Sequence, residues 1–511
     1  MRCFTQAQRA AGHDGSRVHV QADRLVAALP PAAIAPALLG AAVAGLFVGA
    51  LGASAVLAFC VVLALLLAVA ALVRQEVVIA LVLFVLFSDA AAVAVHSHGV
   101  PASAAAVVPL LLAVPLLDGL LGGRAPVVDR TLLVLVALMC AMTASGVLGR
   151  EPAIAENELM TFAIEGLLLY FLLLNVVRSG RLLRLALTTV LVAGAFLAAI
   201  TVLQELTRTF DRPYFGFSGL DIPFLIGQTS EWRATGPVLD PNYYAQLLLP
   251  ALAIGLVAAL RERVPWRRLA AAAMAATILL AIALTGSRGA ALAVAAMLAA
   301  LVWMRYLGAR GLLIAAAAIA VTLALSPSYF QRLSTLTLAG ATAPSGASGG
   351  ADSSVRGRVT ENLAAAQVFA DHPLLGVGPG GFPLYYEEYA SRIGIEIHGR
   401  RRAGADSGSQ SRREAHNIVL GIAADLGITG LALFAAVIGL TLGGLRGARR
   451  RWLAAGRPEL ADGATALLVG LIGYLVAGLF LSLAYDRYFW LIVGLAGAAA
   501  VISTADADAR D

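Results

Sequence analysis

His416 and Asn417 stand at the start of the apolar segment 417–440 and are candidates for catalysis. Histidine is the side chain that most often acts as a general base near neutral pH. The first turn of a helix also presents free backbone N–H groups and a partial positive charge, which suit a phosphate group. A histidine that serves only the start of the helix is the alternative. Asp425, about two and a half turns further along, is a second polar group that is costly inside a membrane.

Arg233 and Arg288 lie at the ends of apolar segments, where a charged side chain is unexpected. Arg288 belongs to 285-TGSRGA-290, a turn so short that its guanidinium has little loop in which to reach water. Arg233 comes shortly before Asp240 and Pro241, which are typical of the first residues of a helix. A charge at a membrane boundary needs a partner or an aqueous cavity, so both arginines are candidate functional groups. An interfacial arginine that reaches lipid headgroups is the alternative for each.

A glycine-rich turn and an aromatic stretch follow a predicted helix further along the chain. Residues 355–371 have apolar side chains at helical spacing and end before Pro373, which predicts an amphipathic helix. The turn 376-GVGPGG-381 has no Gly-Lys-Ser/Thr after it and lacks the strand context of a dinucleotide-binding motif. The aromatic stretch 382-FPLYYEEY-389 comes directly after it. A plain turn accounts for these glycines equally well.

The cysteines and histidines indicate neither a disulfide nor a metal site. Cys3 lies in the polar N-terminal tail, and Cys60 and Cys140 lie inside apolar segments. The histidines other than His416 share no ligand spacing on one helix face. We therefore expect no metal and no cofactor.

The composition places these residues in a membrane protein. Hydrophobic residues make up 60% of the 511 residues and charged residues only 13%, whereas a soluble domain has roughly 25% charged residues. A transmembrane helix needs ~20 apolar residues. Fourteen segments qualify: 32–50, 53–73, 77–96, 101–121, 131–149, 159–177, 184–204, 242–260, 269–285, 289–305, 311–326, 417–440, 464–484 and 488–503. We predict an all-α polytopic membrane protein with about 12–14 transmembrane helices.

The arginines orient the predicted helices. The sequence contains no lysine, so all 37 basic residues are arginines. With the N-terminus inside, inner segments hold 22 of them and short outer segments hold six, while nine fall in one long outer loop that does not count for orientation. The net charge of +6 then reflects topology and anionic membrane lipids. No nucleic-acid partner is expected.

This orientation divides the chain into alternating membrane and loop regions. We expect an inner N-terminal tail at 1–31, N-terminal transmembrane helices at 32–204, an outer loop at 205–241, central transmembrane helices at 242–326, a large outer loop with short helices at 327–416, C-terminal transmembrane helices at 417–503 and an inner tail at 504–511. The residues singled out above then share the outer face.

Taken together, these segments resemble the O-antigen ligase / O-antigen polymerase (Wzy_C-like) superfamily of bacterial membrane glycosyltransferases. The order of the motifs, and the large outer loop followed by three spans, also match. The His-Asn opening and the Ser-Arg-Gly turn are the most specific parts, and the resemblance covers roughly residues 150–500. The matching segments are 233-RATGPVLDPNYYAQ-246, 285-TGSRGA-290, 371-DHPLLGVGPGGFPLYY-386 and 416-HNIVLGIAADLGITGLALF-434.

The resemblance implies a GT-C-type fold in the bacterial inner membrane, with both termini cytoplasmic and the outer loops periplasmic. It implies a glycan donor built on undecaprenyl diphosphate and presented at the periplasmic face. The glycan would pass with inversion to a hydroxyl of a glycan or lipid A-core acceptor, without a nucleotide sugar or an obligatory metal. The partners would be these two substrates and the membrane lipids.

The resemblance also assigns roles to residues. His416 would activate or position the acceptor hydroxyl, and Arg288 and Arg233 would hold the diphosphate. Arginine suits that role because its guanidinium is always charged and can bind two phosphate oxygens at once, and fixed cations stabilise the charge that builds on a leaving diphosphate. The expected substrate-binding residues are Asn417, Ser287, Asn242, Gly378 and Tyr385.

Several activities remain open. A ligase that joins O-antigen to lipid A-core, a polymerase that extends repeat units, and an enzyme acting on an exopolysaccharide or a protein acceptor would share these motifs. A lipid-linked oligosaccharide flippase is the alternative from another class. Transporters of this size often contain internal repeats and polar groups at the membrane midplane. No repeat is visible here, and the polar candidates gather at one face.

Overall fold

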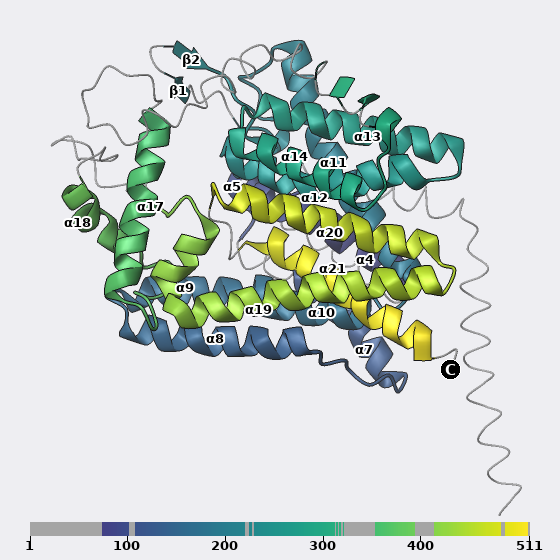
Figure 1. Cartoon of the computed structure of the whole chain (residues 1–511), viewed down its shortest axis with the longest axis horizontal. Coiled ribbons are helices and arrows are strands. Elements are labelled where there is room, and N and C mark those ends of the chain that lie inside the picture. The colour runs from purple at the N-terminus through teal and green to yellow at the C-terminus, as the bar shows by residue number, and fades with distance from the viewer. Residues whose placement is uncertain are drawn as a thin grey trace, which may run out of the picture.

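The computed structural model describes a helical bundle and the segments that cover one of its ends (Figure 1). The predicted tail at 1–31 and the candidate spans 32–50 and 53–73 lie outside the described residues, as does most of 311–326. The described residues are 74–101, 108–219, 224–226, 229–311, 313–314, 316–317, 320, 353–393, 413–481 and 486–508.

Eight described helices are long and apolar enough to cross a membrane. The bent pair α4 (Gln75–Phe87) and α5 (Ala90–His98) would make a ninth span, while α7 (Ala113–Leu121) and α14 (Arg288–Trp303) are shorter. An all-α polytopic membrane protein is therefore confirmed, with eight or nine spans in the described part of a chain for which 12–14 were predicted. The eight are α8 (Arg130–Leu148), α9 (Pro152–Thr161) continued through η1 (Phe162–Leu168) into α10 (Leu169–Val176), α11 (Gly180–Thr207), α12 (Pro241–Arg261), α13 (Pro265–Leu284), α19 (Ile418–Ala454), α20 (Pro458–Gly478) and α21 (Arg487–Asp508).

Short polar residues begin several of these helices. Asp129 accepts a hydrogen bond from the N–H of Leu132 at 2.9 Å at the start of α8, and Ser179 caps α11 in the same way. Asp240, predicted as a cap, accepts from two N–H groups in the first turn of α12 at 2.7 and 3.0 Å. Such caps satisfy N–H groups that have no partner within the helix. The helix interiors satisfy their own backbone groups, as a lipid environment requires.

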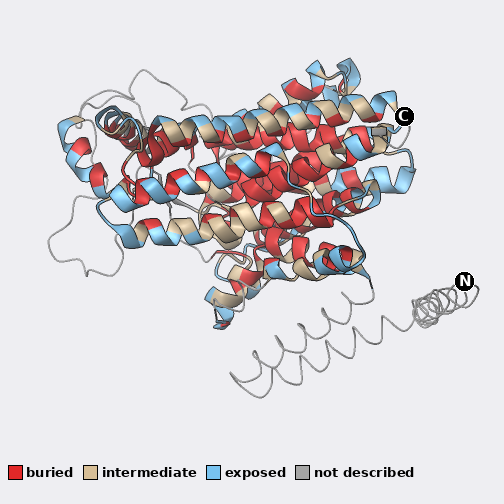
Figure 2. Cartoon of the chain, turned by 90° about the horizontal axis from the view of Figure 1, so that it is seen from below, coloured by how far each residue is buried: buried red, intermediate tan, exposed pale blue. Residues whose placement is uncertain are grey.

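Three helices, α12, α20 and α21, form the most buried part of the bundle, each with 72% of its most apolar stretch buried. Figure 2 shows buried residues gathered along the inside of the helices and exposed ones on the outside. Small residues allow the closest approaches. A Cβ added at Gly194 of α11 would lie 2.4 Å from the Cβ of Ala251 in α12, so this crossing requires a glycine.

The helix α19 is broken at Gly427, whose φ of 64° and ψ of −160° are not helical. The glycine-rich turn after α17 (Ser353–Asp371) fills this break. The N–H of Ile428 donates to the carbonyl of Pro373 at 2.8 Å, and the N–H of Gly378 donates to the carbonyl of Asp425 at 3.0 Å. The carboxylate of Asp425 then accepts from two further N–H groups of the turn, at 3.0 and 3.1 Å.

A partly buried ionic cluster joins two other irregular places. Arg487, at the start of α21, lies 3.5 Å from Asp89 and 3.3 Å from Glu165. Asp89 stands at the 57° bend between α4 and α5, and Glu165 belongs to the π-helical turn η1. The cluster therefore ties the bent helix pair and the π-helix to the last helix. A charge at this depth needs such partners.

The two long connections carry local structure. The connection at 205–241 contains the short helices η2 (Tyr214–Gly216) and η3 (Gly236–Val238) and a hairpin of β1 (Phe224–Ile226) and β2 (Thr229–Glu231), which the sequence did not predict. The connection at 327–416 contains α17 and α18 (Pro383–Ile393). In Figure 1, α17 stands across the end of the bundle, and it packs on α18 and the start of α19.

Candidate functional site

Arg233 holds the turn between α13 and α14. Its Nε donates to the carbonyl of Thr285 at 2.8 Å, and the N–H of Ala234 donates to the carbonyl of Leu284 at 3.1 Å. Ser287 caps α14, and Arg288 is the first residue of that helix. Both arginines are partly buried. The two cations predicted from distant segments therefore lie on adjoining segments at one end of the bundle.

Asn417, at the start of α19, contacts the end of α20 near the Arg288 turn. Its Oδ1 accepts from two N–H groups of the first helical turn, and its Nδ2 donates to the carbonyl of Leu479 at 3.1 Å. Phe480, the next residue, lies against the first turn of α14, because a Cβ at Gly289 would be 3.2 Å from the Cβ of Phe480. Residues 479–480 thus lie between the His416 segment and the turn that carries Arg288.

The first turn of α12 joins the same group. Asn242 accepts a hydrogen bond from a terminal nitrogen of Arg233 at 3.4 Å. Its neighbour Tyr243 donates from its hydroxyl to the carboxylate of Glu414 at 3.1 Å. Because Glu414 is two residues before His416, α12 links the Arg233 segment to the histidine. The structure therefore gathers Arg233, Asn242, Ser287, Arg288, His416 and Asn417 at one end of the bundle.

His416 is paired with a buried carboxylate. Its Nδ1 lies 2.6 Å from Oε2 of Glu361, a residue of α17 that is only 1% exposed. The other oxygen of Glu361 lies 3.8 Å from a terminal nitrogen of Arg413. The His416 side chain is 26% exposed. Because Nδ1 faces Glu361, Nε2 is the nitrogen that can accept a proton from a ligand.

Glu361 was not among the residues expected from the sequence. The helix predicted at 355–371 is present as α17, and Glu361 shares its buried face with Ala364, Ala365 and Val368, all 0% exposed. These residues pack in one cluster with Ala415, next to the histidine. Positions three, four and seven residues apart lie on one face of a helix. In the sequence, Glu361 could have been recognised as a single carboxylate on the otherwise apolar face of the predicted helix.

Gly378 and Tyr385 lie among packing contacts of the loop. Gly378 has a φ of +101° and sits where the turn crosses the break in α19. The ring of Tyr385 is 5% exposed, with the guanidinium carbon of Arg150 3.8 Å from its centroid and the ring of His372 at 5.6 Å. A ring covered in this way offers little surface to a sugar. Substrate contacts for these two residues stay predictions.

Asp486 adds a further carboxyl group beside this end of the bundle. It precedes α21, and burial raises its pKa to about 7, an effect that Arg487 opposes and that Glu165 and Glu414 reinforce. A carboxyl that changes its charge near neutral pH therefore lies within electrostatic range of the His416 segment. Among the described residues, no group of three or more His, Cys, Asp and Glu side chains is arranged to hold a metal ion.

The arrangement combines a proton acceptor with sites for an anion. His416 is oriented by Glu361, and the first turn of α19 beside it carries a partial positive charge. Arg233 and Arg288 place two positive charges on neighbouring segments. Such a site can take a proton from one group while it stabilises negative charge on another.

Part of the chain is similar to a known protein family. Residues 273–435 match the family model described as O-antigen ligase. The matched stretch begins in α13 and ends within α19, so it includes Arg288, Glu361 and His416 but not Arg233. No curated protein matches the chain.

Proposed function

We propose that this chain, whose residues 273–435 match the O-antigen ligase family model, transfers a glycan from undecaprenyl diphosphate to an acceptor hydroxyl at the periplasmic face of the inner membrane. The family and the apolar helices make it a multi-pass membrane protein with a glycan-ligating role. The observation that carries the finer proposal is the meeting of Arg233, the Arg288 turn and the Glu361–His416 pair at one end of the bundle.

In the proposed step, His416 Nε2 takes the proton of the acceptor hydroxyl. The hydroxyl oxygen attacks the anomeric carbon of the donor sugar from the face opposite the diphosphate. The bond between that carbon and the diphosphate oxygen breaks, and its electron pair leaves with undecaprenyl diphosphate. The configuration at the carbon inverts. A positioned general base typically contributes ~10²–10⁴-fold to the rate.

The arginines act on the leaving group. Negative charge grows on the diphosphate as the bond breaks, and fixed cations at that place lower the barrier without having to reorganise. Arg233 is already held against the Thr285 carbonyl, so its guanidinium is fixed next to the turn of Arg288. The polyprenyl chain of the donor would lie in the membrane beside this turn. No step of this proposal requires a metal ion.

Both a ligase and a polymerase are compatible with this chemistry. In each case the donor is a lipid-linked glycan and the nucleophile is a hydroxyl group. The acceptor, whether lipid A-core or a growing glycan, is chosen by groups outside the reacting centre. We therefore propose the reaction without naming the acceptor.

Two substitutions test the proposal in proteoliposomes supplied with purified undecaprenyl-diphosphate-linked glycan and candidate acceptors. His416→Ala should lower transfer ~10²–10⁴-fold because it removes the base. Arg288→Ala should lower transfer by a similar order because it removes a positive charge that stabilises the leaving diphosphate. Arg130→Gln is a matched control, since Arg130 is exposed at the first residue of α8, far along the sequence from these segments.

Transfer at the wild-type rate in both variants, at equal protein levels, would overturn the catalytic assignment. The same proteoliposomes distinguish a flippase. If lipid-linked glycan crosses the bilayer without any new glycosidic bond, and the alanine variants leave that movement unchanged, the protein is a transporter.

A further inference from the structure

Four arginines line a cavity at the opposite end of the bundle from His416. The cavity has a volume of about 260 Å³ and lies between the end of α14, the last part of α19 and the middle of α20. It is lined by Trp303, Met304, Arg305, Arg446, Arg449, Arg450 and Leu468. We call it the α14–α19 pocket.

Three of the four arginines lie on the same face of α19. Arg446, Arg449 and Arg450 are three and four residues apart on α19, so they share one face of that helix. Arg305 approaches from the end of α14, where the chain turns with a φ of 62°. Arg449 is further fixed by a 3.2 Å hydrogen bond from its Nε to Thr465. Four positive charges therefore converge on one cavity.

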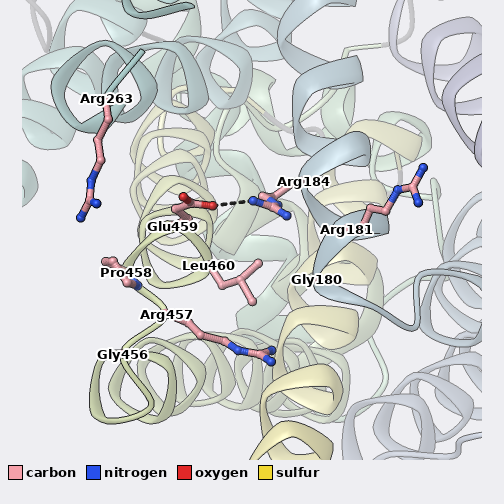
Figure 3. A pocket seen from close by; sticks show the side chains of 9 residues that line it. All are labelled: Gly180, Arg181, Arg184, Arg263, Gly456, Arg457, Pro458, Glu459 and Leu460. Carbon is pink, nitrogen blue, oxygen red and sulfur yellow. Dashed lines mark hydrogen bonds and ion pairs between the residues drawn. The ribbon is translucent and has the colours of Figure 1, made fainter.

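These charges lack the acidic partners seen in a second basic pocket, drawn in Figure 3. That pocket lies between the starts of α11 and α20 and contains Arg181, Arg184, Arg263 and Arg457. Three of its arginines pair with carboxylates, at Glu76, Glu459 and Asp506. In contrast, none of the four arginines of the α14–α19 pocket forms an ion pair with another residue that the structure describes.

The apolar part of the pocket indicates what kind of anion fits. Trp303 is 73% exposed at the end of an apolar helix, a position typical of a membrane interface. Met304 and Leu468 add apolar wall beside the arginines. A small free anion would make no contact with these apolar side chains. A phospholipid would place its phosphate on the arginines and its acyl chains against the apolar side chains. Basic pockets between transmembrane helices bind lipid headgroups in this way.

We propose that the α14–α19 pocket binds the phosphate headgroup of an anionic phospholipid from the membrane leaflet opposite the catalytic end. This inference concerns a separate site and does not depend on the proposed reaction. The role of such a lipid would be to hold α14 against α19 and α20. The α14 helix has only 16 residues and begins at the Arg288 turn, so a lipid bound at its other end would act on both ends of a short element.

The test compares lipids and variants by native mass spectrometry of the full-length protein. The wild-type protein should retain phosphatidylglycerol or cardiolipin in preference to phosphatidylcholine. The double variant Arg446→Gln with Arg450→Gln should bind the anionic lipid about 30-fold more weakly, as expected from roughly 1 kcal/mol for each basic residue near an anionic lipid.

A matched control removes two arginines from the pocket of Figure 3, by Arg181→Gln with Arg263→Gln. This variant should keep the wild-type lipid preference. An equal loss in both double variants would mean that general surface charge attracts the lipid, and the proposal would fail. It would also fail if inorganic phosphate, at equal ionic strength, displaced the lipid at concentrations at which chloride does not.

Discussion

At the residue scale, the contact between Glu361 and His416 gives the histidine a defined orientation. A histidine at the start of a helix can turn freely in solution, and either ring nitrogen can carry the proton. Here Nδ1 lies 2.6 Å from Oε2 of Glu361, which is only 1% exposed, so this ring nitrogen is directed at a buried carboxylate. In the proposed reaction Glu361 would be a positioning residue, because it would act only through His416.

We expect Glu361→Gln to lower the turnover number by roughly 10–100-fold, since a small misplacement of a catalytic group has an effect of about this size. Glu361→Asp should recover part of the loss, because a carboxylate is restored at a slightly greater distance. The measurement is glycan transfer at saturating donor and acceptor. The Michaelis constant for the donor should change little, because Glu361 does not hold the diphosphate. A Gln variant that transfers at the full rate would show that the pair has no part in the reaction.

At the element scale, the break in α19 places the loop relative to the membrane helices. Gly427 interrupts the helix, and the freed backbone groups on each side bond to the 373–378 turn. This turn directly follows α17, which carries Glu361. The break thus fixes where α17 lies over the end of the bundle. It depends on a backbone conformation of Gly427 that residues other than glycine rarely adopt.

Gly427→Ala should destabilise the protein by about 3 kcal/mol, because this region of backbone conformation is essentially restricted to glycine. The new Cβ would also lie 2.4 Å from the carbonyl carbon of Leu374. Gly439→Ala in the same helix is the control, since a Cβ there meets nothing within 4 Å. That substitution should be neutral or slightly stabilising. Thermal unfolding in detergent measures both, and equal midpoints for the two variants would contradict the role of the break.

At the scale of the whole molecule, alternation of the helices brings the candidate site together. The segment before α12, the turn after α13 and the start of α19 come from different parts of the chain, yet they meet at one end because successive spans run in opposite directions. The basic pockets, including the α14–α19 pocket, lie at the other end. The two ends of the bundle therefore differ: the proposed catalytic residues lie at one end, and the two arginine-lined pockets lie at the other.

This difference between the two ends predicts the result of cysteine labelling in a chain whose native cysteines are replaced. Glu387→Cys, exposed in α18, should react with an impermeant maleimide in spheroplasts. Ala454→Cys, exposed at the end of α19, should react only after lysis. The reason is the arginine asymmetry, because basic ends of membrane helices are expected to stay in the cytoplasm. The reverse pattern would place His416 in the cytoplasm and contradict a periplasmic donor.

Local properties of the sequence were sufficient for the class of protein and for naming most of the residues of the candidate site. Hydrophobicity and arginine placement act over a single span, so they indicated a polytopic membrane protein and the ends at which Arg233, Arg288 and His416 stand. The helix at 355–371 also followed from its own periodicity. The family resemblance rested on short motifs of the same kind, and the match at 273–435 confirms it.

Only the tertiary structure decided which of these residues touch. The Glu361–His416 pair, the bond from Arg233 to the Thr285 carbonyl and the crossing of the glycine turn over Gly427 join segments that are far apart in the chain. No window of sequence contains both partners of such a contact, and each forms because helix packing brings two surfaces together. The sequence therefore determined which groups are available at each end of the bundle, while packing determined which carboxylate faces the histidine and which arginines gather in one pocket.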